Sequence, residues 1–176
     1  EDPRPETNKE QAVVHAIQRS QPCEAVFTRA GETHDRYRML VTGPYGVRGL
    51  TEGVMASLRG FVEGGGTVLS LDADWTVANA DLTDERDITA EIVGARYGEA
   101  LPEAASAFEA DGMRVMLPAS VSRREVEVLE GTEVLIAFED GAPAVTRRAI
   151  GEGSVVGIHF DLMAELEKGD TPELAQ

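Results

Sequence analysis

Residues 37–71 constrain the fold of this chain most, because they combine two β-rich runs with a helical stretch between them. The two runs are residues 37–42 and 67–71. Between them, apolar residues recur at helical spacing after Thr51, a candidate N-cap, and the stretch ends at three glycines, residues 64–66. Strand, helix and strand joined by short connections are typical of a right-handed crossover between parallel strands. The sequence therefore predicts a parallel sheet in this half of the chain.

Three further helices are predicted from local signals. A capping-box spacing predicts a helix over about residues 7–20, before an extended run that contains Cys23. Apolar spacing predicts another helix over about residues 83–93, ended by Gly94, and a short helix over 162–166 closes the chain.

Beyond Tyr97 the apolar pattern changes to a period of two, with regular turn signals. Asp111-Gly112 and Asp140-Gly141 each lie between two apolar runs, and a glycine-rich turn at 151–153 precedes the apolar run 155–160. We expect antiparallel hairpins here, with the run 155–160 returning into the main sheet.

The chain has 176 residues, 42% of them hydrophobic and 27% charged, which is typical of one globular domain. We expect a polar stub at 1–10, a single domain over 11–166 and a polar tail at 167–176. The net charge of −16 repels phosphate backbones and anionic lipid headgroups, so neither nucleic acid nor membrane is an expected partner. The sequence has no apolar run long enough to span a bilayer, and a soluble, cytoplasmic protein is favoured.

Two stretches resemble the β-galactosidase trimerisation domain family. The first runs from Tyr37-Arg38-Met39-Leu40-Val41 to Phe61-Val62-Glu63-Gly64-Gly65-Gly66-Thr67, similar to the family's strand and its helix ending in Phe-Val-x-x-Gly-Gly-Thr. The second is Gly141-Ala142-Pro143-Ala144-Val145 with the later turn Gly151-Glu152-Gly153, which is similar to a Gly-x-Pro-Ala-Val run and the turn into the last strand. The resemblance covers about residues 11–161.

The resemblance implies an amidotransferase-like, flavodoxin-like α/β fold, a mostly parallel sheet flanked by helices, here with an antiparallel hairpin portion in the C-terminal half. It also implies an oligomeric contact beside a catalytic barrel. Domains of the family normally start with a β-strand, whereas the first predicted helix here follows only the polar stub. Either the chain is excised from a longer polypeptide, or that strand is lost or supplied by another part.

Catalytic chemistry finds little support in the sequence. An amidotransferase of this class needs a cysteine on a glycine-flanked turn after a strand, together with a histidine base. The corresponding position, after residues 67–71, has no thiol, and Cys23 falls inside a predicted strand. Ser70 reads as a packed strand serine. His15, His34 and His159 have no spacing that predicts a metal site. We therefore expect no catalytic residue, no metal site and no cofactor.

Asp72, Asp74 and Trp75 are the candidate ligand-binding residues, because ligands of open α/β sheets bind beyond the carboxyl ends of the parallel strands. Carboxylates can bind sugar hydroxyls or a cation, and an indole can stack on a pyranose ring. The competing interpretation is that the aspartates form turns and that Trp75 is a core or interface residue. His159 could approach the same edge.

The preferred interpretation is a non-catalytic interaction domain within a carbohydrate-active protein or its oligomer, assembling with itself or with a partner domain. Two alternatives stay open: a sugar or small-molecule binding module at Asp72–Trp75, and an amidotransferase-like hydrolase whose nucleophile the sequence does not reveal.

Overall fold

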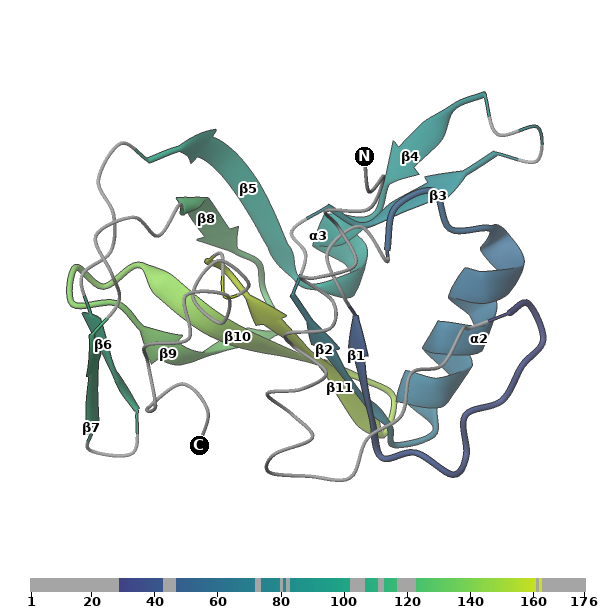
Figure 1. Cartoon of the computed structure of the whole chain (residues 1–176), viewed down its shortest axis with the longest axis horizontal. Coiled ribbons are helices and arrows are strands. Elements are labelled where there is room, and N and C mark those ends of the chain that lie inside the picture. Colours follow the sequence, from purple (N-terminus) through teal and green to yellow (C-terminus); the bar gives the residue numbers. More distant parts are fainter. Residues whose placement is uncertain are drawn as a thin grey trace, which may run out of the picture.

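The computed structural model describes residues 29–42, 47–71, 74–79, 81, 83–101, 107–110, 113–116, 123–160 and 162. The helix predicted over residues 7–20, the run around Cys23 and nearly all of the helix predicted over 162–166 lie outside these residues. Figure 1 shows a five-stranded sheet through the middle of the molecule, with helix α2 (Glu52–Glu63) towards one end and the paired strands β6 (Ala107–Ala110) and β7 (Met113–Met116) at the other.

The five-stranded sheet is mixed, with the strand order β1-β2-β11-β10-β9. Strands β1 (Met39–Thr42), β2 (Thr67–Ser70) and β11 (Gly153–Ile158) run parallel to one another. Strands β10 (Pro143–Ile150) and β9 (Thr132–Ala137) continue the sheet in antiparallel pairing. The predicted return of the run 155–160 into the main sheet is therefore confirmed by β11, which pairs with β2.

Helix α2 (Glu52–Glu63) connects β1 to β2 and confirms the predicted crossover. Thr51 is its N-cap, with its side-chain oxygen accepting a hydrogen bond from the amide of Val54 at 3.3 Å. The buried face of the helix consists of Met55, Leu58 and Val62. Gly65 has a φ of 100°, a left-handed conformation that glycine adopts without a steric penalty, and it allows the turn into β2.

The helix predicted over residues 83–93 is wrong for most of its length. Residues Glu85–Asp87 form strand β4, which pairs with β3 (Thr76–Ala78), and only Thr89–Ile92 form a helix, α3, of one turn. The Asn79 side chain accepts hydrogen bonds from the amides of Thr83 and Asp84, which closes a β3–β4 turn. This local turn competes with a helix start and prevents it.

The remaining strands form two small ribbons and complete the predicted hairpins. Strands β6 (Ala107–Ala110) and β7 (Met113–Met116) pair with each other, and β9 pairs with β10 across Asp140-Gly141. Strand β5 (Ala95–Ala100) pairs with β8 (Arg124–Val128) in a separate ribbon.

The expected flavodoxin-like, helix-flanked α/β class is therefore wrong. The described part of the chain contains eleven strands and two helices, and its main sheet is mixed. The physical reason is that β9 and β10 join the main sheet as antiparallel strands. Antiparallel neighbours are connected by short turns, whereas further parallel strands would each have required a crossover helix. None of the described helices is long and apolar enough to cross a membrane.

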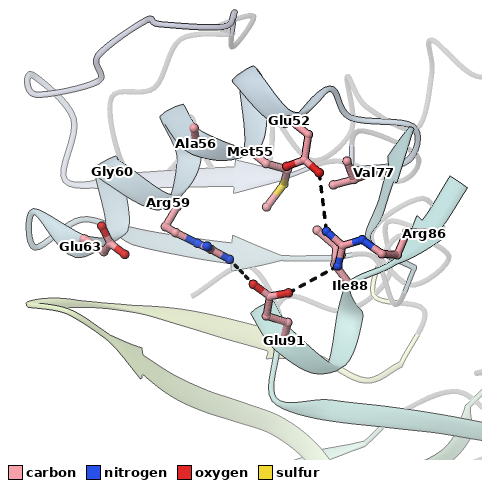
Figure 2. A pocket seen from close by; sticks show the side chains of 10 residues that line it. All are labelled: Glu52, Met55, Ala56, Arg59, Gly60, Glu63, Val77, Arg86, Ile88 and Glu91. Atoms are coloured by element: carbon pink, nitrogen blue, oxygen red, sulfur yellow. Dashed lines mark hydrogen bonds and ion pairs between the residues drawn. The ribbon is translucent and has the colours of Figure 1, made fainter. Parts of the chain in front are cut away.

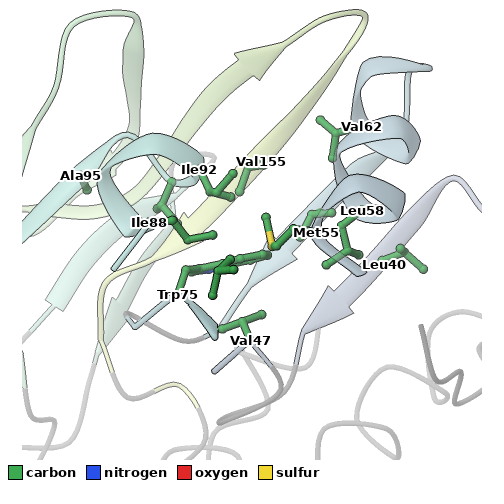
Figure 3. Close-up of a cluster of buried hydrophobic side chains, with 13 residues drawn as sticks. Leu40, Val47, Met55, Leu58, Val62, Trp75, Ile88, Ile92, Ala95 and Val155 are labelled. Atoms are coloured by element: carbon green, nitrogen blue, oxygen red, sulfur yellow. The ribbon is translucent and has the colours of Figure 1, made fainter. Parts of the chain in front are cut away.

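Two hydrophobic clusters hold these elements together. The larger lies between α2, α3 and the parallel strands, and Trp75 is in its centre with Val47, Met55 and Ile88 close by (Figure 3). The smaller contains Phe108, Phe138 and Phe160, whose ring centroids are 5.8–6.2 Å apart.

Candidate functional site

Trp75 lies where a ligand could approach the carboxyl end of β2, but its side chain points into the core. It is 1% exposed, and its indole N–H donates a hydrogen bond to Oγ of Ser70 at 2.8 Å. Its backbone N–H bonds to the hydroxyl of Thr89 at 2.9 Å. The ring faces are therefore covered by the protein, and this geometry gives no support to stacking on a sugar.

Asp74 lies at the same edge with its side chain in contact with solvent. It forms ion pairs with Arg48, which precedes α2, and with Arg124 of β8 at 3.5 Å. Two guanidinium groups thus compensate the charge of this carboxylate. Asp72 lies outside the described residues. Ligand binding by Asp72 and Asp74 stays a prediction.

Ser70, the hydroxyl nearest to the position of an amidotransferase nucleophile, is fully buried. Its oxygen is the acceptor for the Trp75 indole, which fits the interpretation as a packed strand serine. Cys23 and His15 lie outside the described residues. His34 is buried against Tyr37 and Phe61, with ring centroids 6.2 Å from each.

His159, which directly follows β11, is buried and is hydrogen-bonded to one side chain from each of two strands, β5 and β10. The Tyr97 hydroxyl of β5 lies 2.7 Å from its Nδ1, and the Thr146 hydroxyl of β10 lies 2.8 Å from its Nε2. Burial disfavours the charged ring and lowers the pKa of His159 to about 4, so the imidazole is neutral at pH 7. Because Thr146 is fully buried, its hydroxyl is not exposed to a substrate. The two hydrogen bonds connect the β5–β8 ribbon to the main sheet.

A groove opens between α2, strands β3 and β4, and α3, and we call it the α2–α3 groove (Figure 2). Its volume is about 340 Å³. Met55, Val77 and Ile88 supply buried apolar surface. The other residues that line it are Glu52, Ala56, Arg59, Gly60, Glu63, Arg86 and Glu91.

Charged side chains cross this groove as a connected network. Arg59 of α2 and Arg86 of β4 both contact Glu91 of α3, the second at 3.7 Å, and Arg86 also lies 3.7 Å from Glu52. Figure 2 shows Glu91 between the two guanidinium groups. The sequence pattern does not predict this site, because it places residues 86–91 within one helix. Among the described residues, no group of three or more His, Cys, Asp or Glu side chains could hold a metal ion.

Known proteins resemble this chain in structure but not in sequence. No protein-family model matches the sequence, and no curated protein matches it. An exo-β-1,4-mannosidase from Opitutaceae bacterium strain TAV5 matches 96% of this chain with a TM-score of 0.64 and 17% identity. A GH42 β-galactosidase from G. stearothermophilus, in the form of a catalytic mutant, matches 93% with a TM-score of 0.60 and 20% identity. At these identities the likeness shows a shared fold.

The matched proteins differ in how much of their own chain has this fold. The chain spans 30% of the mannosidase and 26% of the β-galactosidase. It spans 81% of a cytoplasmic protein from Salmonella typhimurium, which matches with a TM-score of 0.59 and 10% identity. The fold therefore occurs both as a part of long glycosidases and as most of a short protein.

Proposed function

We propose that this chain is a non-catalytic interaction domain of a carbohydrate-active protein and that it associates with further copies of itself. The observation that carries the proposal is the coverage: more than nine-tenths of this chain matches about a quarter to a third of a β-galactosidase and a mannosidase. A unit of that size is one part of a larger glycosidase, and the resemblance of its glycine-rich segments to the β-galactosidase trimerisation domain points to assembly as its role.

The buried state of the candidate chemical groups supports a non-catalytic role. Ser70, Thr146 and His159 are all buried, and each is engaged in a hydrogen bond with a neighbouring side chain. The conformation described here therefore does not present their hydroxyl and imidazole groups to a substrate, although nucleophilic catalysis requires an accessible group next to a base.

Strand β9 supplies an exposed apolar surface that supports association. It is the last strand of the main sheet, and Val134 and Leu135 are each 43% exposed. Ile136 pairs with Val145 and Val134 pairs with the next residue of β10, Thr146, so Leu135 forms a bulge between them. Exposed apolar side chains on an edge strand favour contact with another chain.

The proposal is tested by sedimentation of the purified chain at micromolar concentration. We expect a species larger than a monomer, and we expect its fraction to increase from about 0.1 M to about 1 M salt, because screening weakens the repulsion between chains that each carry a charge of −16. Leu135→Lys should shift the equilibrium towards monomer. The matched control is Met116→Lys on β7, because Met116 is 54% exposed.

Two results would overturn the proposal. One is a folded chain that stays monomeric over the whole salt range. The other is hydrolysis of nitrophenyl β-galactoside or β-mannoside by the purified chain that increases in proportion to its concentration and survives repeated purification.

A further inference from the structure

We propose that the α2–α3 groove binds a neutral, polyhydroxylated ligand, a monosaccharide or the end of an oligosaccharide. This site is additional to the interaction role and does not depend on it. Four features of the groove support this site: its charge, the hydrogen-bonding groups that line it, its apolar floor and the free space at Gly60.

The charges of the groove favour a neutral ligand over an ion. Its lining carries two guanidinium groups and three carboxylates, one negative charge in excess, on a chain whose net charge is −16. An anion would approach against this field. A cation that reached Glu91 would have to displace Arg59 and Arg86, which already contact that carboxylate. A neutral ligand meets neither penalty.

The same side chains offer donors and acceptors close together, which suits a ring with adjacent hydroxyls. Guanidinium groups donate hydrogen bonds only, and carboxylates accept them, whereas a sugar hydroxyl does both. The Arg59, Arg86, Glu52 and Glu91 side chains are about half exposed or more, so their ion pairs contribute little to stability. Ligand hydroxyls can therefore insert into this network at low cost.

Met55, Val77 and Ile88 form the floor of the groove, and because they are only 4–6% exposed they offer a narrow apolar strip to the C–H face of such a ring. All three side chains belong to the main core, so this surface is held in place from beneath. The groove volume of about 340 Å³ is at the lower end of the range for small-molecule sites, and five of its ten lining residues are charged. The described lining contains no aromatic ring, so we expect a dissociation constant of about 1 mM.

Gly60 provides an independent observation about the free space in the groove. It lies inside helix α2, where glycine is a poor helix former, and a Cβ added there would meet no atom within 4 Å. Packing within the described chain therefore does not require glycine at this position. Because residue 60 lines the groove, we expect a larger side chain at this position to occupy part of it.

The test is an NMR titration of the full chain with methyl β-galactoside and methyl β-mannoside, up to about 100 mM. We expect saturable shifts of the amides of α2, α3 and residues 86–88. Gly60→Leu should weaken binding at least about tenfold by filling the groove, whereas Gly60→Ala should leave it within about twofold. Both substitutions replace glycine by a better helix former, so thermal melting at or above that of the wild type verifies that the fold is intact.

Three results would overturn the inference. The first is the absence of saturable shifts with either glycoside. The second is saturation that Gly60→Leu leaves unchanged in a folded variant. The third is that sulfate or spermidine, tested as an anion and a cation, saturates the groove at lower concentration than the glycosides. Each result is independent of the sedimentation experiment, so failure of this site leaves the interaction role intact.

Discussion

The indole N–H of Trp75 donates its hydrogen bond to the hydroxyl of Ser70 at 2.8 Å, and the two side chains are 1% and 0% exposed. Ser70 is the last residue of β2, and Trp75 follows it after a short connection. The bond fastens the start of β3 to the end of β2 inside the main core. The sequence predicts Trp75 as a candidate ligand-binding residue and Ser70 as a packed strand serine, and their buried contact favours a structural role for both side chains.

Ser70→Ala should lower the free energy of unfolding by about 1–3 kcal/mol, because the indole N–H would lose this acceptor in a place that water does not reach. Urea denaturation of the variant measures the change. In the background of Trp75→Phe, which has no N–H, the same substitution should cost clearly less. Equal costs in both backgrounds would mean that the hydrogen bond does not contribute.

Local signals predicted the β1-α2-β2 unit and the hairpins, because each is specified by nearby residues. Thr51, the glycines at 64–66 and the pair Asp140-Gly141 lie within a few residues of the structure they determine. The class of the fold depends on which hairpin strand joins which sheet. The pairing of Ser154 with Thr67 joins residues far apart in the chain, and no local pattern encodes that β10 and β9 follow on its other side.

The candidate site was harder to predict for a related reason. The position of Trp75 after a strand predicts its place at the sheet edge but not the direction of its side chain, and burial against Val47 and Met55 decides that. The α2–α3 groove combines residues of α2 with Arg86 and Glu91. Those two residues reach it only because β4 replaces most of the predicted helix.

Gly65 and Gly66 are both needed for the turn into β2, for different reasons. Gly65→Ala should cost about 1–2 kcal/mol, because a residue with a side chain is strained at a φ of 100°. Gly66→Ala should also destabilise, because its Cβ would overlap the ring of Phe61. Thermal unfolding measures both. In the background of Phe61→Leu, Gly66→Ala should cost less, whereas the cost of Gly65→Ala should stay the same. A smaller cost for both substitutions would contradict these separate causes.

The N-cap of α2 should contribute about 1 kcal/mol. Thr51→Ala removes the oxygen that accepts the hydrogen bond from the amide of Val54, and it should lower the free energy of unfolding by that amount. Thr51→Ser keeps the oxygen and serves as the control, with a stability close to that of the wild type. A loss of the same size in both variants would assign the effect to the Thr51 methyl group.

His159 should make the stability of the protein fall as the pH is lowered from about 6.5 to about 4. Its pKa in the folded chain is lowered to about 4, below the ordinary value of 6.5, because burial disfavours the charged ring. The unfolded chain therefore binds the proton more tightly. Neutral His159 therefore contributes to the free energy of unfolding in full above pH 6.5, and this stabilisation is lost as the pH falls to about 4. The loss amounts to about 3 kcal/mol.

His159→Gln removes this titration and keeps a neutral polar side chain between Tyr97 and Thr146. The free energy of unfolding of wild type and variant, measured by urea denaturation at several pH values, should converge as the pH falls from 6.5 to 4. Carboxylates affect both proteins alike. Asp140 is one of them: its hydrogen bond with Arg123 lowers its pKa below 3.8, so its stabilising contribution is lost only at more acidic pH. Parallel curves between pH 6.5 and 4 would show that the imidazole titrates in the folded protein as it does in the unfolded chain.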